Sequence, residues 1–129
     1  MQVLYFHENT NLSVNDLTII LVLYDRGDYY HYPMRWMKYA SKYFQKYKIY
    51  IADGSGKSEL QNLFNNKKNF NEVDYEYFQY PKDKNYNDYF SKLDNILSKV
   101  KTEFSILTDD DDFLSSKAID AFYSIFKKQ

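Results

Sequence analysis

The sequence predicts an α/β domain with three layers, in which helices cover both faces of a mostly parallel sheet. Short runs rich in β-branched and aromatic residues alternate with amphipathic helical segments along the chain. The run at residues 17–23 is continuous and rich in β-branched residues, which is typical of a strand buried on both faces, as in parallel sheets. A helix between two strands favours a right-handed crossover and parallel pairing.

The first elements follow from apolar runs and from helical spacing. Residues 1–6 form a candidate short strand, and residues 17–23 form the first buried strand. A helix is expected to begin at residue 30 or at Pro33 and to end near residue 47, because proline is tolerated in a first helical turn. The next strand is expected at residues 48–52.

The middle of the chain is expected to continue the same alternation. Ser58 is a candidate cap for a helix that ends near residue 67, and residues 65–71 form a polar loop. Residues 75–80 alternate weakly between polar and apolar and form a third strand of the parallel set, which ends before Pro81.

The last elements complete the sheet. Residues 86–100 form a helix, and residues 103–108 form a strand that ends beside four aspartates. A final helix begins at residue 115 or 116 and ends near residue 126. One face of the helix at 86–100 carries the apolar side chains Tyr89, Phe90, Leu93, Ile96, Leu97 and Val100.

The composition is typical of one globular domain, spanning residues 1–129. Hydrophobic residues make up 44% and charged residues 27%, which allows a core together with a polar surface. The formal net charge of -1 gives no reason to expect nucleic acid as a partner. The chain has no cysteine, and no apolar run approaches the roughly 18 residues of a membrane span. We therefore expect a cytoplasmic protein without thiolate metal sites.

A run of four carboxylates is the most informative feature of the sequence. Asp109, Asp110, Asp111 and Asp112 directly follow an apolar strand. Adjacent carboxylates repel one another, and Mn²⁺ or Mg²⁺ relieves this repulsion because hard cations prefer oxygen ligands. In an Asp-x-Asp arrangement, one side chain can face the metal and the other a ribose hydroxyl. The alternatives are a helix cap at Asp112 and a solvated acidic surface.

A second candidate loop follows the strand at residues 48–52. It contains Gly-Lys-Ser, but a phosphate-binding loop needs another glycine five residues before Gly56, and Ile51 stands there. An NTPase is therefore not expected. Asp53 can accept a hydrogen bond from the imino N–H of uracil or guanine, or it can cap the next helix.

A third candidate loop contains Tyr24, Asp25 and Arg26, directly after the first buried strand. Tyr24 can stack on a base, and Arg26 can pair with phosphates or with neighbouring carboxylates. A surface turn is the alternative. In a parallel sheet, ligands bind outside the carboxyl ends of the strands, so all three loops are expected at one edge.

These segments together resemble the amino-terminal part of family 2 glycosyltransferases, which have the GT-A fold. The matching segments are residues 18–26, 49–55, 86–100 and 106–113, so the resemblance covers about residues 17–126. It implies a Rossmann-like nucleotide-binding half. It also implies that the loop at Tyr24, Asp25 and Arg26 lines the base and ribose of a nucleotide-sugar.

The resemblance further implies roles for the acidic residues. Asp53 would contact the base, usually uracil, although Ala52 replaces the first Asp of the family's Asp-Asp-Gly-Ser segment. Asp109 and Asp111 would form the Asp-x-Asp pair, with Asp109 toward the ribose or sugar and Asp111 toward the metal. Asp110 is a further nucleotide-sugar candidate, because a run of four leaves the register open by one position.

We therefore expect a glycosyltransferase, or its donor-binding part, that transfers a sugar from a nucleotide-diphosphate sugar, such as a UDP-sugar, to an acceptor hydroxyl. The acceptor is an unidentified glycan, lipid or protein. The family's catalytic base lies in an acceptor-binding half that we do not find in this sequence, so no catalytic base is assigned. The alternatives are a Mg²⁺-dependent nucleotidyltransferase and a non-enzymatic, doubly wound interaction module that binds Mg²⁺.

Overall fold

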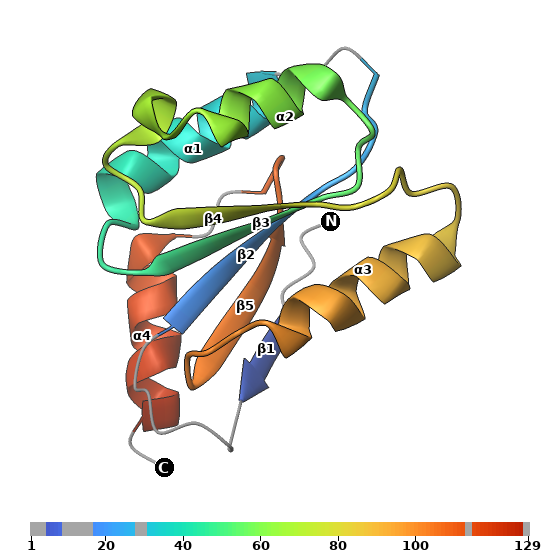
Figure 1. Cartoon of the computed structure of the whole chain (residues 1–129). Coiled ribbons are helices and arrows are strands. Elements are labelled where there is room, and N and C mark those ends of the chain that lie inside the picture. The colour runs from blue at the N-terminus through green and yellow to red at the C-terminus, as the bar shows by residue number, and fades with distance from the viewer. Residues whose placement is uncertain (1–4, 9–16, 28–30, 113–114, 128–129) are drawn as a thin grey trace.

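The computed structural model describes residues 5–8, 17–27, 31–112 and 115–127, which form one sheet with helices on both faces (Figure 1). The five strands lie in the order β1-β5-β2-β3-β4. Four strands pair in parallel, and β1 (Tyr5–Glu8) lies antiparallel at the edge beside β5 (Phe104–Asp109). The expected α/β class with a mostly parallel sheet is therefore confirmed.

The two central strands are the most buried part of the sheet. Every residue of β2 (Leu17–Leu23) is buried, because this strand has a neighbour on each side and helices above and below. β2 pairs with β3 (Lys48–Asp53) on one side and with β5 on the other. Val22 is level with Asp109, and Leu23 is level with Asp53, so the three strands end at the same edge.

Two separate apolar clusters, one on each face, hold the helices against the sheet. α1 (His31–Tyr43), α2 (Ser58–Asn65) and α4 (Ser116–Lys127) lie on one face, and α3 (Tyr86–Ser98) lies on the other (Figure 1). The larger cluster includes Leu21, Trp36, Phe44, Phe64, Ile106 and Ile119. The smaller cluster, beneath α3, includes Ile20, Val22, Tyr50, Ala52, Ile96 and Val100.

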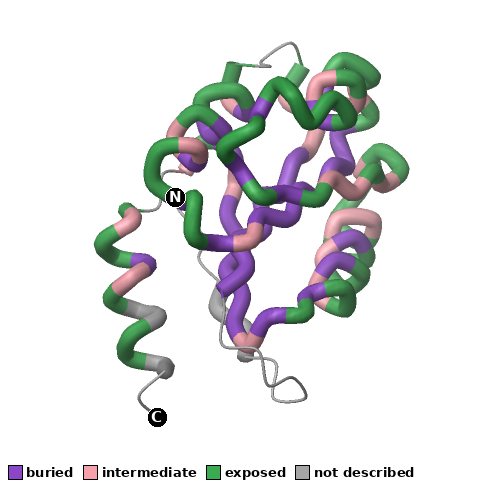
Figure 2. The backbone as a smooth tube through the Cα atoms, turned by 60° about the vertical axis from the view of Figure 1, so that its left-hand side comes forward, coloured by how far each residue is buried: buried purple, intermediate pink, exposed green. Residues whose placement is uncertain are grey.

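α4 is the least embedded helix. Its backbone lies beside the rest of the molecule, and its described residues are mostly exposed (Figure 2). Ile119 is buried in the larger cluster, and the Tyr47 hydroxyl donates a hydrogen bond to Asp120. These two contacts link α4 to the face that α1 and α2 also cover.

Several local expectations need correction. A 3₁₀ helix at Lys67–Phe70 replaces part of the expected polar loop, because Asn66 caps it through Lys68 N and Phe70 is buried. Ser58 is the first residue of α2 and not its cap, since Lys57 occupies the cap position. Phe90 was expected on the buried face of α3, but 59% of it is exposed.

The ends of the elements differ from the expectations by a few residues. α1 ends at Tyr43, and β4 spans Tyr75–Gln79. The candidate strand at residues 1–6 falls partly outside the described residues, and β1 begins at Tyr5. Among the described residues, no helix combines the length and the apolar character that crossing a membrane requires.

Candidate functional site

The order of the strands reverses at β2, at the carboxyl edge of the sheet. The chain passes from β2 to β3 to β4 on one side of β2, and then returns through α3 to β5 on the other side. Ligands of open α/β sheets bind at such a reversal, outside the carboxyl ends of the strands. Tyr24 follows β2 at this point, and Asp109 is the last residue of β5. The fold therefore places two of the three candidate loops beside each other at this reversal.

The four aspartates separate into two groups with different surroundings. Asp109, Asp111 and Asp112 each bring one carboxylate oxygen to within 4.8 Å of the others, and we call these three residues the acidic triad. Asp110 is excluded from this group, because its side chain is buried and forms an ion pair with Arg26. The distance between Arg26 Nε and Asp110 Oδ1 is 2.8 Å.

Arg26 is fixed by several partners at once. Besides Asp110, its Nη2 lies 3.2 Å from Asp111 Oδ1. Its guanidinium carbon lies 4.4 Å from the ring centroid of Tyr24, within the range of a cation–π contact. The pKa of Arg26 is raised, because the attraction of Asp110 and the other neighbouring anions outweighs the opposing effect of burial. Arg26 thus neutralises one carboxylate of the run and orients Tyr24.

Burial and mutual repulsion raise the pKa values of three carboxylates of the run, Asp109, Asp110 and Asp112. Burial raises the pKa of Asp110 to about 6. Burial also raises the pKa of Asp109, and the charges of Asp112 and Asp111 raise it further. The pKa of Asp112 is raised by the same two causes. A positive charge placed among these side chains would favour their ionised forms.

The acidic triad has the chemical character of a site for a hard divalent cation. Three carboxylate oxygens within 4.8 Å of one another are the type of ligand that Mg²⁺ and Mn²⁺ accept. Oδ2 of Asp112 is buried and has no hydrogen-bond partner among the described residues. A buried oxygen without a partner carries a desolvation cost that a cation would offset. The residues present therefore fit such a cation.

A cavity lined by tyrosines lies next to the acidic triad. Tyr24, Tyr86 and Tyr89 line this cavity of about 720 Å³, together with Asp83 and other residues of the segment after β4, and we call it the tyrosine pocket. Burial raises the pKa of Tyr89 to about 12, and the charge of Asp109 is the next contribution. The pocket and the acidic triad are thus close enough to interact electrostatically.

Asp25 is held by the neighbouring loops. Its Oδ1 accepts a hydrogen bond of 2.9 Å from Gly27 N. Lys57 and Lys82 lie 3.4 and 3.0 Å from its two carboxylate oxygens. The hydrogen bond from Gly27 and the lysine contacts lower the pKa of Asp25 to about 2. Asp25 therefore links its own loop to the loop after β3 and to the segment after β4, and it also lines the tyrosine pocket.

Asp53 lies on the other face of the sheet from the tyrosine pocket. Ser55 N donates to its Oδ1 over 2.8 Å, and the hydroxyl of Tyr77 donates to its Oδ2. Tyr77 packs on the larger cluster and stacks on Phe64 of α2, with ring centroids 5.4 Å apart. Both carboxylate oxygens of Asp53 therefore already accept hydrogen bonds, and the residue is only 2% exposed.

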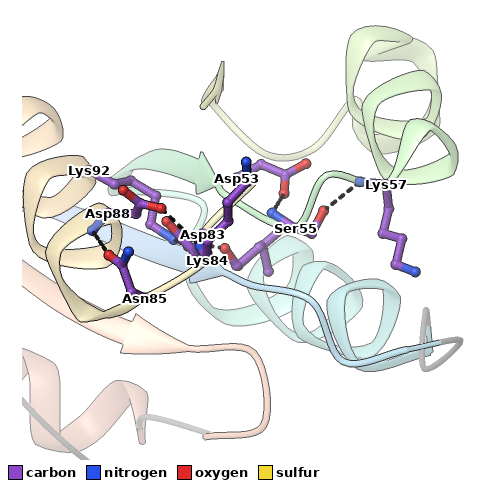
Figure 3. A network of polar contacts seen from close by, with 9 residues as sticks. Asp53, Ser55, Lys57, Asp83, Lys84, Asn85, Asp88 and Lys92 are labelled. Carbon is purple, nitrogen blue, oxygen red and sulfur yellow. Dashed lines mark hydrogen bonds and ion pairs between the residues drawn. The ribbon is translucent and has the colours of Figure 1, made fainter. Parts of the chain in front are cut away.

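Two charged residues of the site were missed in the sequence. Lys92 of α3 is buried and forms an ion pair with Asp83, close to the tyrosine pocket (Figure 3). The sequence did contain a signal, since Lys92 lies three residues after Tyr89 and four before Ile96, on the apolar face of the helix. A lysine on the apolar face of a helix either destabilises the fold or is a buried cation with a partner. Asp83 had no comparable signal, because it lies in an irregular segment.

Comparison with known proteins adds no relative from which a role can be transferred. No protein-family model, no curated protein and no solved structure matches this chain.

Proposed function

We propose that this chain is the donor-binding part of a glycosyltransferase that uses a nucleotide-diphosphate sugar, in the first place a UDP-sugar, together with Mn²⁺ or Mg²⁺. The observation that supports this most is the separation of the aspartates. Arg26 neutralises Asp110, whereas the acidic triad gathers beside the tyrosine pocket. A cation site next to an aromatic pocket, at the reversal of a parallel sheet, is an arrangement suited to a nucleotide diphosphate.

In this proposal, each part of the ligand has a chemically matched environment. The base lies in the tyrosine pocket, because every base offers a flat face for stacking on Tyr24 or Tyr89. Asp109, whose charge acts on Tyr89 of the pocket, accepts hydrogen bonds from ribose hydroxyls. Asp111, which is exposed, faces the diphosphate through the metal. Lys57 and Lys82 lie near the same edge as further positive charges.

The proposed reaction transfers the sugar from the diphosphate to an acceptor hydroxyl. A bound cation would neutralise the diphosphate as it leaves the sugar. This chain's residues bind the nucleotide, orient it against the sheet edge and hold Asp111 in place through Arg26. We assign no residue of the chain as the base that deprotonates the acceptor, and we identify no particular glycan, lipid or protein acceptor.

Replacing Asp111 by Ala tests the proposal. The variant should lose the metal-dependent part of UDP binding, with affinity lowered at least about tenfold, because a ligand of the cation is removed. Titration calorimetry with UDP and Mn²⁺ measures this. Asp94→Ala is the matched control, since Asp94 is exposed on α3, away from the triad. Unchanged UDP affinity in Asp111→Ala would remove the support for the proposal.

A panel of ligands separates the proposal from its rivals. Thermal protection by a UDP-sugar with Mn²⁺, and not by nucleoside triphosphates, is the expected result. A clear preference for a triphosphate would favour a nucleotidyltransferase. Metal binding without any effect of nucleotides would favour a non-enzymatic interaction module.

A further inference from the structure

Lys92 is a buried cation whose position is fixed by three contacts. The residue is 3% exposed, and its Nζ lies 3.0 Å from the carbonyl oxygen of Leu23, at the end of β2. It also donates to Asp83 Oδ2 and lies 4.8 Å from the ring centroid of Tyr89. A buried lysine persists only with partners, so these contacts specify the arrangement of α3 on the sheet.

Gly54 completes the same arrangement from the backbone. Its N–H donates to Leu23 O over 2.9 Å, and its carbonyl oxygen accepts from Asp83 N over 2.9 Å. A Cβ atom at Gly54 would lie 2.7 Å from Lys92 Nζ, so only glycine allows the lysine and Asp83 to approach the strand end this closely. Asp83 is therefore held by its backbone and by its side chain (Figure 3).

The two carboxylate oxygens of Asp83 differ in their contacts, and 10% of its side chain is exposed. Its Oδ2 is bound to Lys92, while Oδ1 accepts no hydrogen bond from any residue that the structure describes. The residue lines the tyrosine pocket with Tyr24 and Tyr89. Asp53 differs in both respects, because both of its oxygens accept hydrogen bonds and it lies against Tyr77 on the opposite face.

We infer that Asp83 is the residue that selects the base of the nucleotide, and that Lys92 is the residue that positions it. This inference rests on the proposed function, because it assumes that a nucleotide occupies the tyrosine pocket. The free oxygen of Asp83 accepts the imino N–H of a base such as uracil or guanine. Cytosine and adenine present an unprotonated ring nitrogen at the equivalent place, which a carboxylate repels.

The first test needs no variant. Calorimetric titrations of the whole chain with Mn²⁺ should show UDP binding at least about tenfold more tightly than CDP, since one hydrogen bond to a charged acceptor is gained or lost. UDP methylated at N3 of the ring should be as weak as CDP. Equal affinities for the three ligands would overturn the inference but leave the proposed function standing. Absence of binding for every nucleotide would count against the proposed function itself.

The second test assigns the preference to a residue. Asp83→Asn should reduce the ratio of UDP to CDP affinity at least about fivefold, because an amide can also donate to cytosine. Asp88→Asn is the matched control in the first turn of α3, where Asp88 Oδ2 accepts from Lys84 N over 3.0 Å. A loss of preference in Asp53→Asn, with none in Asp83→Asn, would overturn the assignment.

The third test concerns Lys92 as a positioning residue. Lys92→Met should abolish the base preference, whereas affinity for Mn²⁺ alone should not fall, because Lys92 is not a member of the acidic triad and its positive charge, which acts on Asp109, opposes a cation there. Lys92→Arg should restore part of the preference by keeping a cation beside Asp83. A full preference for UDP in Lys92→Met would show that the position of Asp83 does not depend on Lys92.

Discussion

At the scale of single residues, Arg26 determines what the aspartate run can do. It pairs with Asp110 at 2.8 Å and approaches Asp111 at 3.2 Å, so the buried carboxylate is compensated inside the protein. The pair with Asp111 is weaker, because 44% of the Asp111 side chain is exposed to water. The acidic triad thus retains a net negative charge for an external cation. The separation of Asp110 from the acidic triad could not be predicted from four adjacent aspartates in the sequence, since it depends on which aspartate faces Arg26.

Replacing Arg26 by Gln should destabilise the fold. The substitution leaves Asp110 buried without its cation, and we expect a loss of about 3 kcal/mol in the free energy of unfolding. Urea denaturation of the metal-free protein measures this loss. Arg35→Gln, at an exposed position of α1, should change stability by less than about 0.5 kcal/mol. Equal losses in the two variants would show that the contact with Asp110 contributes little.

The raised pKa of Asp110 predicts a pH dependence of stability. Its usual pKa is 3.8, and burial raises it to about 6 in the folded protein. The folded chain therefore binds the proton more tightly than the unfolded chain does, and stability falls as pH rises from about 4 to about 6. Asp110→Asn removes this contribution. The free energy of unfolding of the variant minus that of the natural chain should therefore be roughly 2 kcal/mol larger at pH 7 than at pH 4.

Urea denaturation at both pH values, with a chelator present, measures that relative gain. Asp94→Asn is the control, because its side chain is exposed and should show no comparable trend. A stability difference between Asp110→Asn and the natural chain that does not change with pH would contradict the assignment.

At the scale of elements, the segment between β4 and α3 is anchored to the end of β3, at Asp53 and Gly54. Its backbone is bound through Asp83 N, and Tyr80 N donates to Asp53 O over 2.8 Å. These contacts bring the start of α3 to the carboxyl edge, where Tyr86 and Tyr89 line the tyrosine pocket. The pocket wall therefore depends on a contact between three segments that are distant in sequence.

Substituting Gly54 by Ala should disturb this wall. The added Cβ would lie 2.7 Å from Lys92 Nζ and would displace it or Asp83, so we expect a loss of about 2 kcal/mol in stability. Hydrogen exchange should increase in residues 80–92. Gly27→Ala is the comparison: its φ of +69° strains alanine, but a Cβ there meets nothing within 4 Å. The increased exchange should therefore be specific to Gly54→Ala, and equal exchange in both variants would refute the anchoring role.

At the scale of the whole molecule, local patterns predicted the elements but not their arrangement. The apolar runs of β2 and β3 and the helical spacing of α3 were sufficient for the α/β class. The strand order, and the antiparallel position of β1, depend on long-range pairing that no local pattern contains. That order places Tyr24 and Asp109 together. It also places Asp53 on the face opposite to the pocket, although alternation with Ile49 and Ile51 was visible in the sequence.

The coupling between Mn²⁺ and UDP tests the central proposal most directly, namely that the acidic triad and the tyrosine pocket form one site. Calorimetric titration with Mn²⁺ should be done on the natural chain, without and with saturating UDP. We expect UDP to tighten Mn²⁺ binding at least about fivefold, and Mn²⁺ to tighten UDP binding by the same factor, because coupling between two ligands is reciprocal. The same Mn²⁺ affinity with and without UDP would contradict the proposal.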